Sequence, residues 1–161
     1  MTGMRILTLT DVERAIQSSW GADTSFAKPA YLARVPGRPS RGQCGATALV
    51  VQDFFGGELL LADLSVNGVL DGVHYWNRLA SGLDIDLTRD QLEPDEEVVN
   101  VRLVQAEREN LVGEGARTYA TLRRRVLAAL GQPPDRADAD RADVDRADAD
   151  RAEETEEADI S

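Results

Sequence analysis

The stretch from Gln43 to Phe55 most constrains the fold, because it is apolar on almost every side of a helix. Gln52 and Asp53 interrupt a run of Cys, Ala, Leu, Val and Phe side chains. A helix that is apolar on most faces is buried on most faces, so we predict a central helix that other elements cover. Gly56 and Gly57 follow at once and predict its end, since glycine adopts the left-handed C-cap conformation without steric cost.

After this helix the apolar period changes to two, which is typical of strands that alternate between two faces. Turn signals at Asn67-Gly68 and Ser81-Gly82 separate the first three segments. We predict strands at 58–65, 69–79, 83–87 and 98–104. After the third strand, Thr88 has the capping-box spacing to Gln91, which predicts a short turn. In the second strand, His74, Trp76 and Arg78 are expected on one face, with Tyr75 on the other.

Two further helices complete the pattern. The first follows Thr10, which has the capping-box spacing to Glu13, and places Val12, Ile16 and Trp20 on one face. The last runs from 116 to 130. The order of helix, buried helix, consecutive strands and helix predicts an α+β fold with an antiparallel sheet rather than alternating βαβ units.

The chain has 161 residues, which favours one domain with an appendage. We predict a single α+β domain over 1–131 and a disordered acidic tail over 132–161. The tail repeats an Arg-Ala-Asp step with period five, and this period fits neither a helix face nor a strand face. It carries about −8 of the formal net charge of −11 and almost no large apolar side chains to offset the entropy of ordering.

Composition excludes several classes of protein. The net negative charge argues against nucleic acid as a partner, because phosphate binding needs a basic face. No run approaches the ~20 apolar residues of a membrane span, and the first ten residues lack the core of a signal peptide, so we expect a cytoplasmic protein. One cysteine and one histidine provide no zinc cluster, and no Gly-rich loop with a following Lys indicates a nucleotide. We expect no metal and no cofactor.

The single cysteine, Cys44, lies at the predicted start of the buried helix. A thiolate there interacts favourably with the positive end of the helix dipole and with unpaired backbone N–H groups, which lowers a thiol pKa. The N–H of Cys44 is also a natural donor to an oxyanion. The alternative is that Cys44 begins the apolar stripe that continues through Ala48 and Val51, as a small core side chain.

The single histidine, His74, lies within a strand, and Asp86 follows twelve residues later in the next strand. A hairpin near Gly82 would put Asp84 and Asp86 on one face, where one of them orients the imidazole. Each of these residues has an ordinary structural alternative. Together, a helix-opening thiol, an imidazole and a carboxylate supply the nucleophile, the base and the orienting acid of a Cys–His–Asp site.

A helix-opening Cys, a strand His-x-Trp and a strand Asp-x-Thr resemble papain-like and transglutaminase-like cysteine enzymes. Over residues 8–130 the chain is more specifically similar to the YunG family of small bacterial proteins, through Ser19-Trp20, Gly42-Gln43-Cys44, residues 47–57, residues 74–79 and residues 86–91. The wider resemblance implies that Cys44 is the nucleophile, His74 the base and Asp86 the orienting acid. It also implies acyl transfer or amide hydrolysis through a thioester.

The chain departs from the wider pattern in three places. Leu87 stands where transglutaminase-like sequences usually have Pro, and Gly45 stands where papain has Trp. The glutamine that papain-like enzymes carry several residues before the cysteine is absent, and Gln43 is adjacent to Cys44 instead. The source of the second oxyanion donor is therefore open.

From the sequence we expect a cysteine hydrolase or acyltransferase acting on an amide, isopeptide or ester bond of a small or peptidic substrate. The candidate substrate-binding residues are Gln43, Trp76 and Arg78. One alternative is a non-catalytic binding or regulatory module of the same fold, whose acidic tail contacts a basic protein partner. Another is a redox-sensing cysteine that forms a sulfenic acid without turnover.

Overall fold

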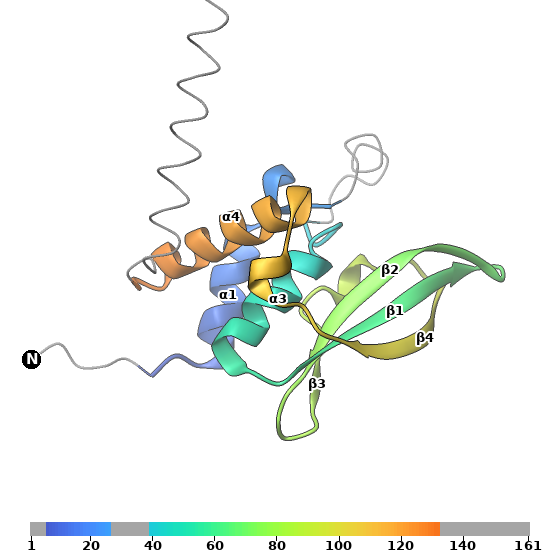
Figure 1. Ribbon diagram of the computed structural model, residues 1–161, viewed down its shortest axis with the longest axis horizontal. Coiled ribbons are helices and arrows are strands. Elements are labelled where there is room, and N and C mark those ends of the chain that lie inside the picture. Colours follow the sequence, from blue (N-terminus) through green and yellow to red (C-terminus); the bar gives the residue numbers. More distant parts are fainter. Residues whose placement is uncertain (1–5, 27–38, 133–161) are drawn as a thin grey trace, which may run out of the picture.

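The computed structural model describes residues 6–26 and 39–132, and the expected acidic tail lies outside them. The helices gather on one side and the sheet extends from the other (Figure 1). The helices are α1 (Leu9–Ser19), α3 (Cys44–Phe55) and α4 (Gly113–Ala129). The strands are β1 (Glu58–Val66), β2 (Val69–Arg78), β3 (Asp84–Ile85) and β4 (Glu96–Val104). The expected α+β class is confirmed.

Helix α3 is the centre of the core. Every residue from Cys44 to Val51 is buried. Helix α4 and strand β2 pack against α3, and α1 packs against α4 in the same hydrophobic core. The apolar side chains that cover it include Val12, Ile16, Leu122 and Val126, each with no exposed surface. The helix ends at Gly56, whose φ of 68° is the positive backbone angle expected there. The predicted central helix is confirmed.

The start of α1 differs from the expectation. The capping box is formed by Thr8 and Asp11, because the Thr8 hydroxyl accepts from the Asp11 backbone N–H and the Asp11 carboxylate accepts from the Thr8 N–H. Thr10 therefore lies inside the helix. Two Thr-x-x-acid pairs overlap in this stretch. Using the first one begins the helix two residues earlier and still buries Val12, Ala15 and Ile16.

The sheet has the order β3-β2-β1-β4, with antiparallel pairing throughout. Asn67 and Gly68 both have positive φ, as a two-residue hairpin turn of the primed type requires. Ala62 pairs with His74 and Leu60 with Trp76, so His74 and Trp76 share a face. On the opposite face, the Asn77 amide donates to the Ala48 carbonyl of α3 at 2.8 Å.

The third strand is shorter than expected, and Asp86 lies beyond its end. Only Asp84 and Ile85 pair with β2. The Asp86 carboxylate accepts from the Thr88 backbone N–H at 3.1 Å, and this local turn draws the chain out of the sheet. Thr88 makes no side-chain cap for the 3-10 turn Arg89–Gln91, although its spacing to Gln91 predicted a capping box.

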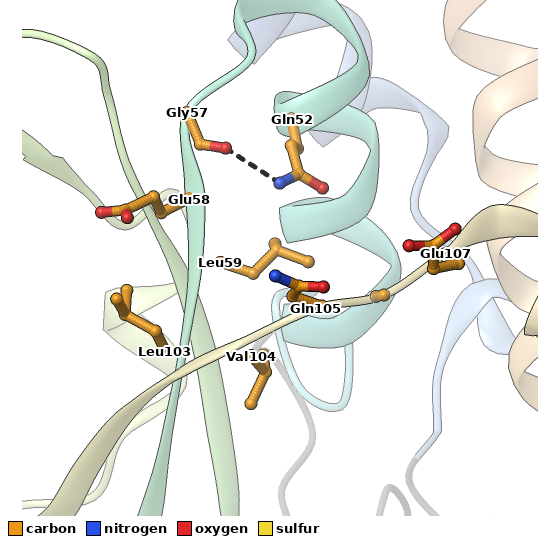
Figure 2. Close-up of a pocket in the computed structure, with 9 residues that line it drawn as sticks. Gln52, Gly57, Glu58, Leu59, Leu103, Val104, Gln105 and Glu107 are labelled. Carbon is orange, nitrogen blue, oxygen red and sulfur yellow. Dashed lines mark hydrogen bonds between the residues drawn. The ribbon is translucent and has the colours of Figure 1, made fainter.

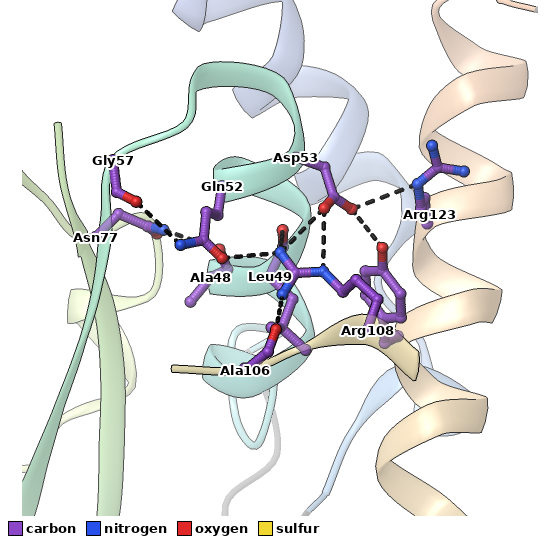
Figure 3. Close-up of polar contacts among 10 residues, drawn as sticks. Ala48, Leu49, Gln52, Asp53, Gly57, Asn77, Ala106, Arg108 and Arg123 are labelled. Carbon is purple, nitrogen blue, oxygen red and sulfur yellow. Dashed lines mark hydrogen bonds and ion pairs between the residues drawn. The ribbon is translucent and has the colours of Figure 1, made fainter. Parts of the chain in front are cut away.

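A polar network ties the last turns of α3 to the following elements (Figure 3). Asp53 accepts from Arg108 at 3.0 Å and pairs with Arg123 at 3.3 Å, and the Tyr119 hydroxyl also donates to it. Arg108 donates in addition to the Leu49 carbonyl and to Gln52. Several partly buried partners share these charges, so the network fixes α3 relative to α4 better than one exposed ion pair would.

The first prediction concerns Gly57, where the chain leaves α3 and enters the sheet. A Cβ at this position would lie 2.3 Å from the Arg78 carbonyl oxygen, and the residue has a φ of +79°. We expect Gly57→Ala to lower the free energy of unfolding by about 2–4 kcal/mol, from strain and overpacking together.

The matched control is Gly68→Ala, where φ is +80° and no atom lies within 4 Å of the added carbon. Backbone strain alone should cost about 1–2 kcal/mol there. Urea unfolding of both variants measures the difference, and equal losses would contradict the close approach of Gly57 to β2.

Candidate functional site

Cys44 is the first residue of α3, and the residues before it hold the start of this helix in place. The N-cap residue Gln43 is 2% exposed. Its carboxamide oxygen accepts from the Thr24 hydroxyl at 2.8 Å, and its nitrogen donates to the Gly21 carbonyl at 2.9 Å. The Gln43 side chain, a candidate for substrate binding, thus anchors the start of α3 to the segment that follows α1.

His74 lies in the middle of β2 and is 1% exposed. Its Nε2 atom is 2.7 Å from an Asp86 carboxylate oxygen, while the other Asp86 oxygen is held by Thr88. Trp76 stacks beside the imidazole, with ring centroids 5.9 Å apart and an interplanar angle of 23°. These contacts fix both the orientation of the ring and the nitrogen that faces the carboxylate.

The thiol of Cys44 lies where the His74 side chain and the Tyr75 backbone interact with it and lower its pKa. The structure therefore brings Cys44, His74 and Asp86 together from α3, β2 and the turn after β3. Because Asp86 contacts Nε2, Nδ1 is the ring nitrogen that could exchange a proton with the sulfur, although Gln91 also lies within hydrogen-bond distance of it.

Burial and pairing act in opposite directions on the two titrating groups. Burial opposes an imidazolium, but hydrogen bonds from Asp86 and Cys44 outweigh it and raise the pKa of His74 to about 9. Burial also opposes a thiolate, but the hydrogen bond and charge of His74, with smaller contributions from Gln91 and Tyr75, lower the pKa of Cys44. The lowered pKa of Cys44 and the raised pKa of His74 both favour a thiolate–imidazolium pair.

Gln91 also belongs to this site, although sequence reasoning assigned it to a capping box. Its Nε2 atom is 2.7 Å from Nδ1 of His74. The same side chain also interacts with the Cys44 thiol and contributes to its lowered pKa. The signal that could have found it is the spacing Asp86-x-Thr88-x-x-Gln91. An Asx turn at Asp86 folds the next residues back toward the histidine that Asp86 contacts.

Arg41 is a second residue that the sequence did not single out. It is 6% exposed, and its guanidinium donates to the Gln91 carbonyl at 2.5 Å and pairs with Glu93 at 3.2 Å. Arg41 thus connects the turn before Cys44 with the segment that carries Gln91. A buried guanidinium with a carboxylate and a carbonyl partner fixes the spacing of these two segments.

The other two candidate substrate-binding residues, Trp76 and Arg78, lie on the His74 face of β2. Both bind the Asp84 carboxylate. Arg78 binds Asp84 through Nε at 2.7 Å and through Nη2 at 3.3 Å, and the Trp76 indole donates to Asp84 at 3.2 Å. Arg78 and Asp84 are 40% and 42% exposed, so water screens this pair and its net contribution to stability is small.

A cavity of about 390 Å³ lies away from this site (Figure 2). It is lined by Gln52, Leu59 and the segment 103–107. Cys44 and Gln52 are eight residues apart on one helix, which corresponds to about 12 Å along its axis. The cavity therefore opens near the last turns of α3, whereas Cys44 is at the first.

Within residues 6–26 and 39–132, no group of three or more His, Cys, Asp or Glu side chains is placed to hold a metal ion. Over the same residues, no helix has the length and apolar character needed to cross a bilayer.

The family model described as the YunG protein matches residues 8–131. No curated protein and no solved structure matches the chain.

The second prediction concerns the protonation of His74. Because its pKa is raised to about 9, the ring should stay charged through neutral pH and lose its proton only as the pH rises through that value. In Asp86→Asn the main partner loses its charge, so we expect the midpoint to fall by more than one pH unit.

The measurement is a ¹⁵N-histidine NMR titration, which needs no assignment because the chain has one histidine. Asp84→Asn is the matched control, since Asp84 binds Arg78 and Trp76 rather than His74. A parent midpoint near 6.5 would contradict the geometry of the site.

Proposed function

The chain belongs to the YunG family, and we propose that it is a cysteine-nucleophile hydrolase or acyltransferase that works through a thioester. The observation that carries the proposal is that the single thiol interacts with the single imidazole, whose Nε2 atom is 2.7 Å from an Asp86 carboxylate oxygen. The same arrangement supports a relationship to papain-like and transglutaminase-like enzymes, in which these three roles occur together.

The first step is activation of the nucleophile. Cys44 transfers its proton from Sγ to Nδ1 of His74, and Asp86 stabilises the imidazolium through Nε2–H. The lowered pKa of Cys44 and the raised pKa of His74 both favour this transfer. Deprotonation matters because the thiolate, not the thiol, attacks a carbonyl carbon.

The second step forms the thioester. The thiolate attacks the carbonyl carbon of an amide, isopeptide or ester, and the electron pair of the C=O bond moves to the oxygen. The N–H groups of the first turn of α3 have no intrahelical acceptor, and the N–H of Cys44 is placed to donate to this oxyanion. When the oxyanion collapses, the imidazolium gives its proton to the departing amine or alcohol.

The third step releases the acyl group. Water or an amine attacks the thioester carbon, His74 takes the proton of the attacking group, and Cys44 leaves as the thiolate that His74 reprotonates. Water gives hydrolysis and an amine gives transfer. Trp76 limits the access of water to the imidazole through its stacked ring, and a substrate carboxylate would compete with Asp84 for the exposed Arg78.

The third prediction tests the reactivity of the thiol. Iodoacetamide should alkylate the folded protein once, at pH 6–7, because Cys44 is the single cysteine and its pKa is lowered. His74→Ala should slow this reaction at least tenfold, by removing the main partner of the thiolate. Intact-mass spectrometry over time gives the rates, and Cys44→Ala should stay unmodified.

Val73→Ala is the matched control, since Val73 is the preceding residue of the same strand and is 46% exposed. Its alkylation rate should equal that of the parent. If the parent thiol reacts only after denaturation, Cys44 is a core side chain and the enzymatic proposal is wrong.

The fourth prediction tests acyl transfer directly. An activated aryl ester should release its phenol in a burst and leave one acyl group on Cys44, seen as a single added mass on the intact protein. Cys44→Ala should show neither the burst nor the added mass. Release of the acyl group that accelerates with added amine indicates a transferase, whereas release that is insensitive to amines indicates a hydrolase.

A further inference from the structure

The Gln91 carboxamide lies between the two reacting groups of the site. Its Nε2 atom is 2.7 Å from His74 Nδ1, and the side chain also hydrogen-bonds to Cys44. Gln91 is 5% exposed. Its Oε1 atom is buried and accepts no hydrogen bond from the described residues. The nitrogen end is therefore engaged with the site, while the oxygen end leaves the carboxamide free to turn.

The hydrogen bond from Gln91 to His74 and the proton transfer from Cys44 exclude one another. An amide nitrogen donates only, so it can bond to Nδ1 only while that nitrogen carries no proton. When the thiol proton moves to Nδ1, this nitrogen becomes a donor like the Gln91 Nε2 atom. The two atoms then no longer form a hydrogen bond. The Gln91 N–H groups lose Nδ1 as an acceptor, while the thiolate, with which the Gln91 side chain also interacts, can still accept from them.

The sulfur is also the point from which negative charge leaves during attack. As the S–C bond forms, the charge moves from Sγ to the carbonyl oxygen, which is two bonds away from the sulfur. A donor that stabilises the thiolate therefore lies close to the position where the oxyanion develops. The N–H of Cys44, at the start of α3, is one donor to this oxygen in the proposed reaction, and a second donor would stabilise it further.

We propose that Gln91 is a further catalytic residue. Its N–H groups hold the imidazole while the ring is neutral, and in the thiolate–imidazolium form of the pair they are released to the substrate carbonyl oxygen. This inference rests on the proposed function, and it names the second oxyanion donor of that reaction. The atoms balance without another reagent, because the only proton that moves is the one from Sγ to Nδ1.

The backbone of Gln91 is held while its side chain turns. Arg41 donates to the Gln91 carbonyl from the turn before Cys44, and its charge is balanced by Glu93. Asp86 and Cys44 are the charged or titrating groups that contact His74, and the Tyr75 hydroxyl is further along the same strand with a pKa raised mainly by burial. The Arg78–Asp84 pair adjoins Trp76 on the outer side.

The fifth prediction separates a role in oxyanion binding from a role in positioning. Alkylation by iodoacetamide forms no oxyanion, whereas acylation by an aryl ester does. Gln91→Met keeps the length of the side chain but removes its donors. We expect acylation of Cys44 to slow about 100-fold or more, the usual effect of losing one oxyanion donor, while alkylation at a pH where the thiol is fully ionised stays within about threefold of the parent.

Two further variants serve as controls. Gln91→Glu should also lose acylation, because its carboxylate cannot donate to an oxyanion, and it provides a second variant should Gln91→Met fold poorly by circular dichroism. Gln52→Met removes an amide at the other end of α3, where it bonds to Gly57 and Arg108, and should leave both rates unchanged. Equal losses in the two reactions for Gln91→Met, or no loss in either, overturn the proposal.

One readout does not depend on turnover. In a Cys44→Ala background, the remaining Gln91 donor stabilises the neutral ring, so adding Gln91→Met should raise the ¹⁵N titration midpoint of His74 by about half a pH unit or more. An unchanged midpoint overturns the proposed hydrogen bond. If this midpoint moves but the parent is never acylated, Gln91 holds the base and the proposed function itself is wrong.

Discussion

Burial of α3 is the constraint on which the rest of the structure depends. Because this helix is apolar on most sides, α4 and β2 pack against it, and α1 completes the same core by packing against α4. Polar anchors then fix its axial position: Gln43 bonds to Thr24 at the first turn, Ala48 to Asn77 in the middle, and Asp53 to Arg108 at the last turn. The thiol on its first residue is thereby placed against the strand that carries the imidazole.

The same burial would make the site inert without the carboxylate. A buried imidazole prefers to be neutral and a buried thiol prefers to stay protonated. Asp86, at 2.7 Å from His74, raises the pKa of the imidazole in spite of its burial. The imidazolium in turn lowers the pKa of the Cys44 thiol. The electrostatics of the site therefore depend on the short turn in which Thr88 holds Asp86 toward β2.

Much of the fold could be predicted because it follows from local patterns. The apolar run of α3, the Asn67-Gly68 hairpin and the alternation that puts His74 and Trp76 on one face are properties of short segments. The errors arose where two local patterns competed. Thr8 and Thr10 both have the spacing of a capping box, and Thr8 is the residue that forms it. Gln91 has the same spacing to Thr88, but its side chain contacts the His74 imidazole instead.

The sequence by itself determined which chemical groups exist: one thiol, one imidazole, a carboxylate twelve residues further on, and a central helix that begins at the thiol. Only the tertiary structure decided which of them meet. Gln91 and Arg41 join the site through contacts across 17 and 50 residues of chain. Hydrogen bonds between segments so distant in the chain depend on how the helices pack against the sheet. A periodic pattern within one segment does not predict that packing.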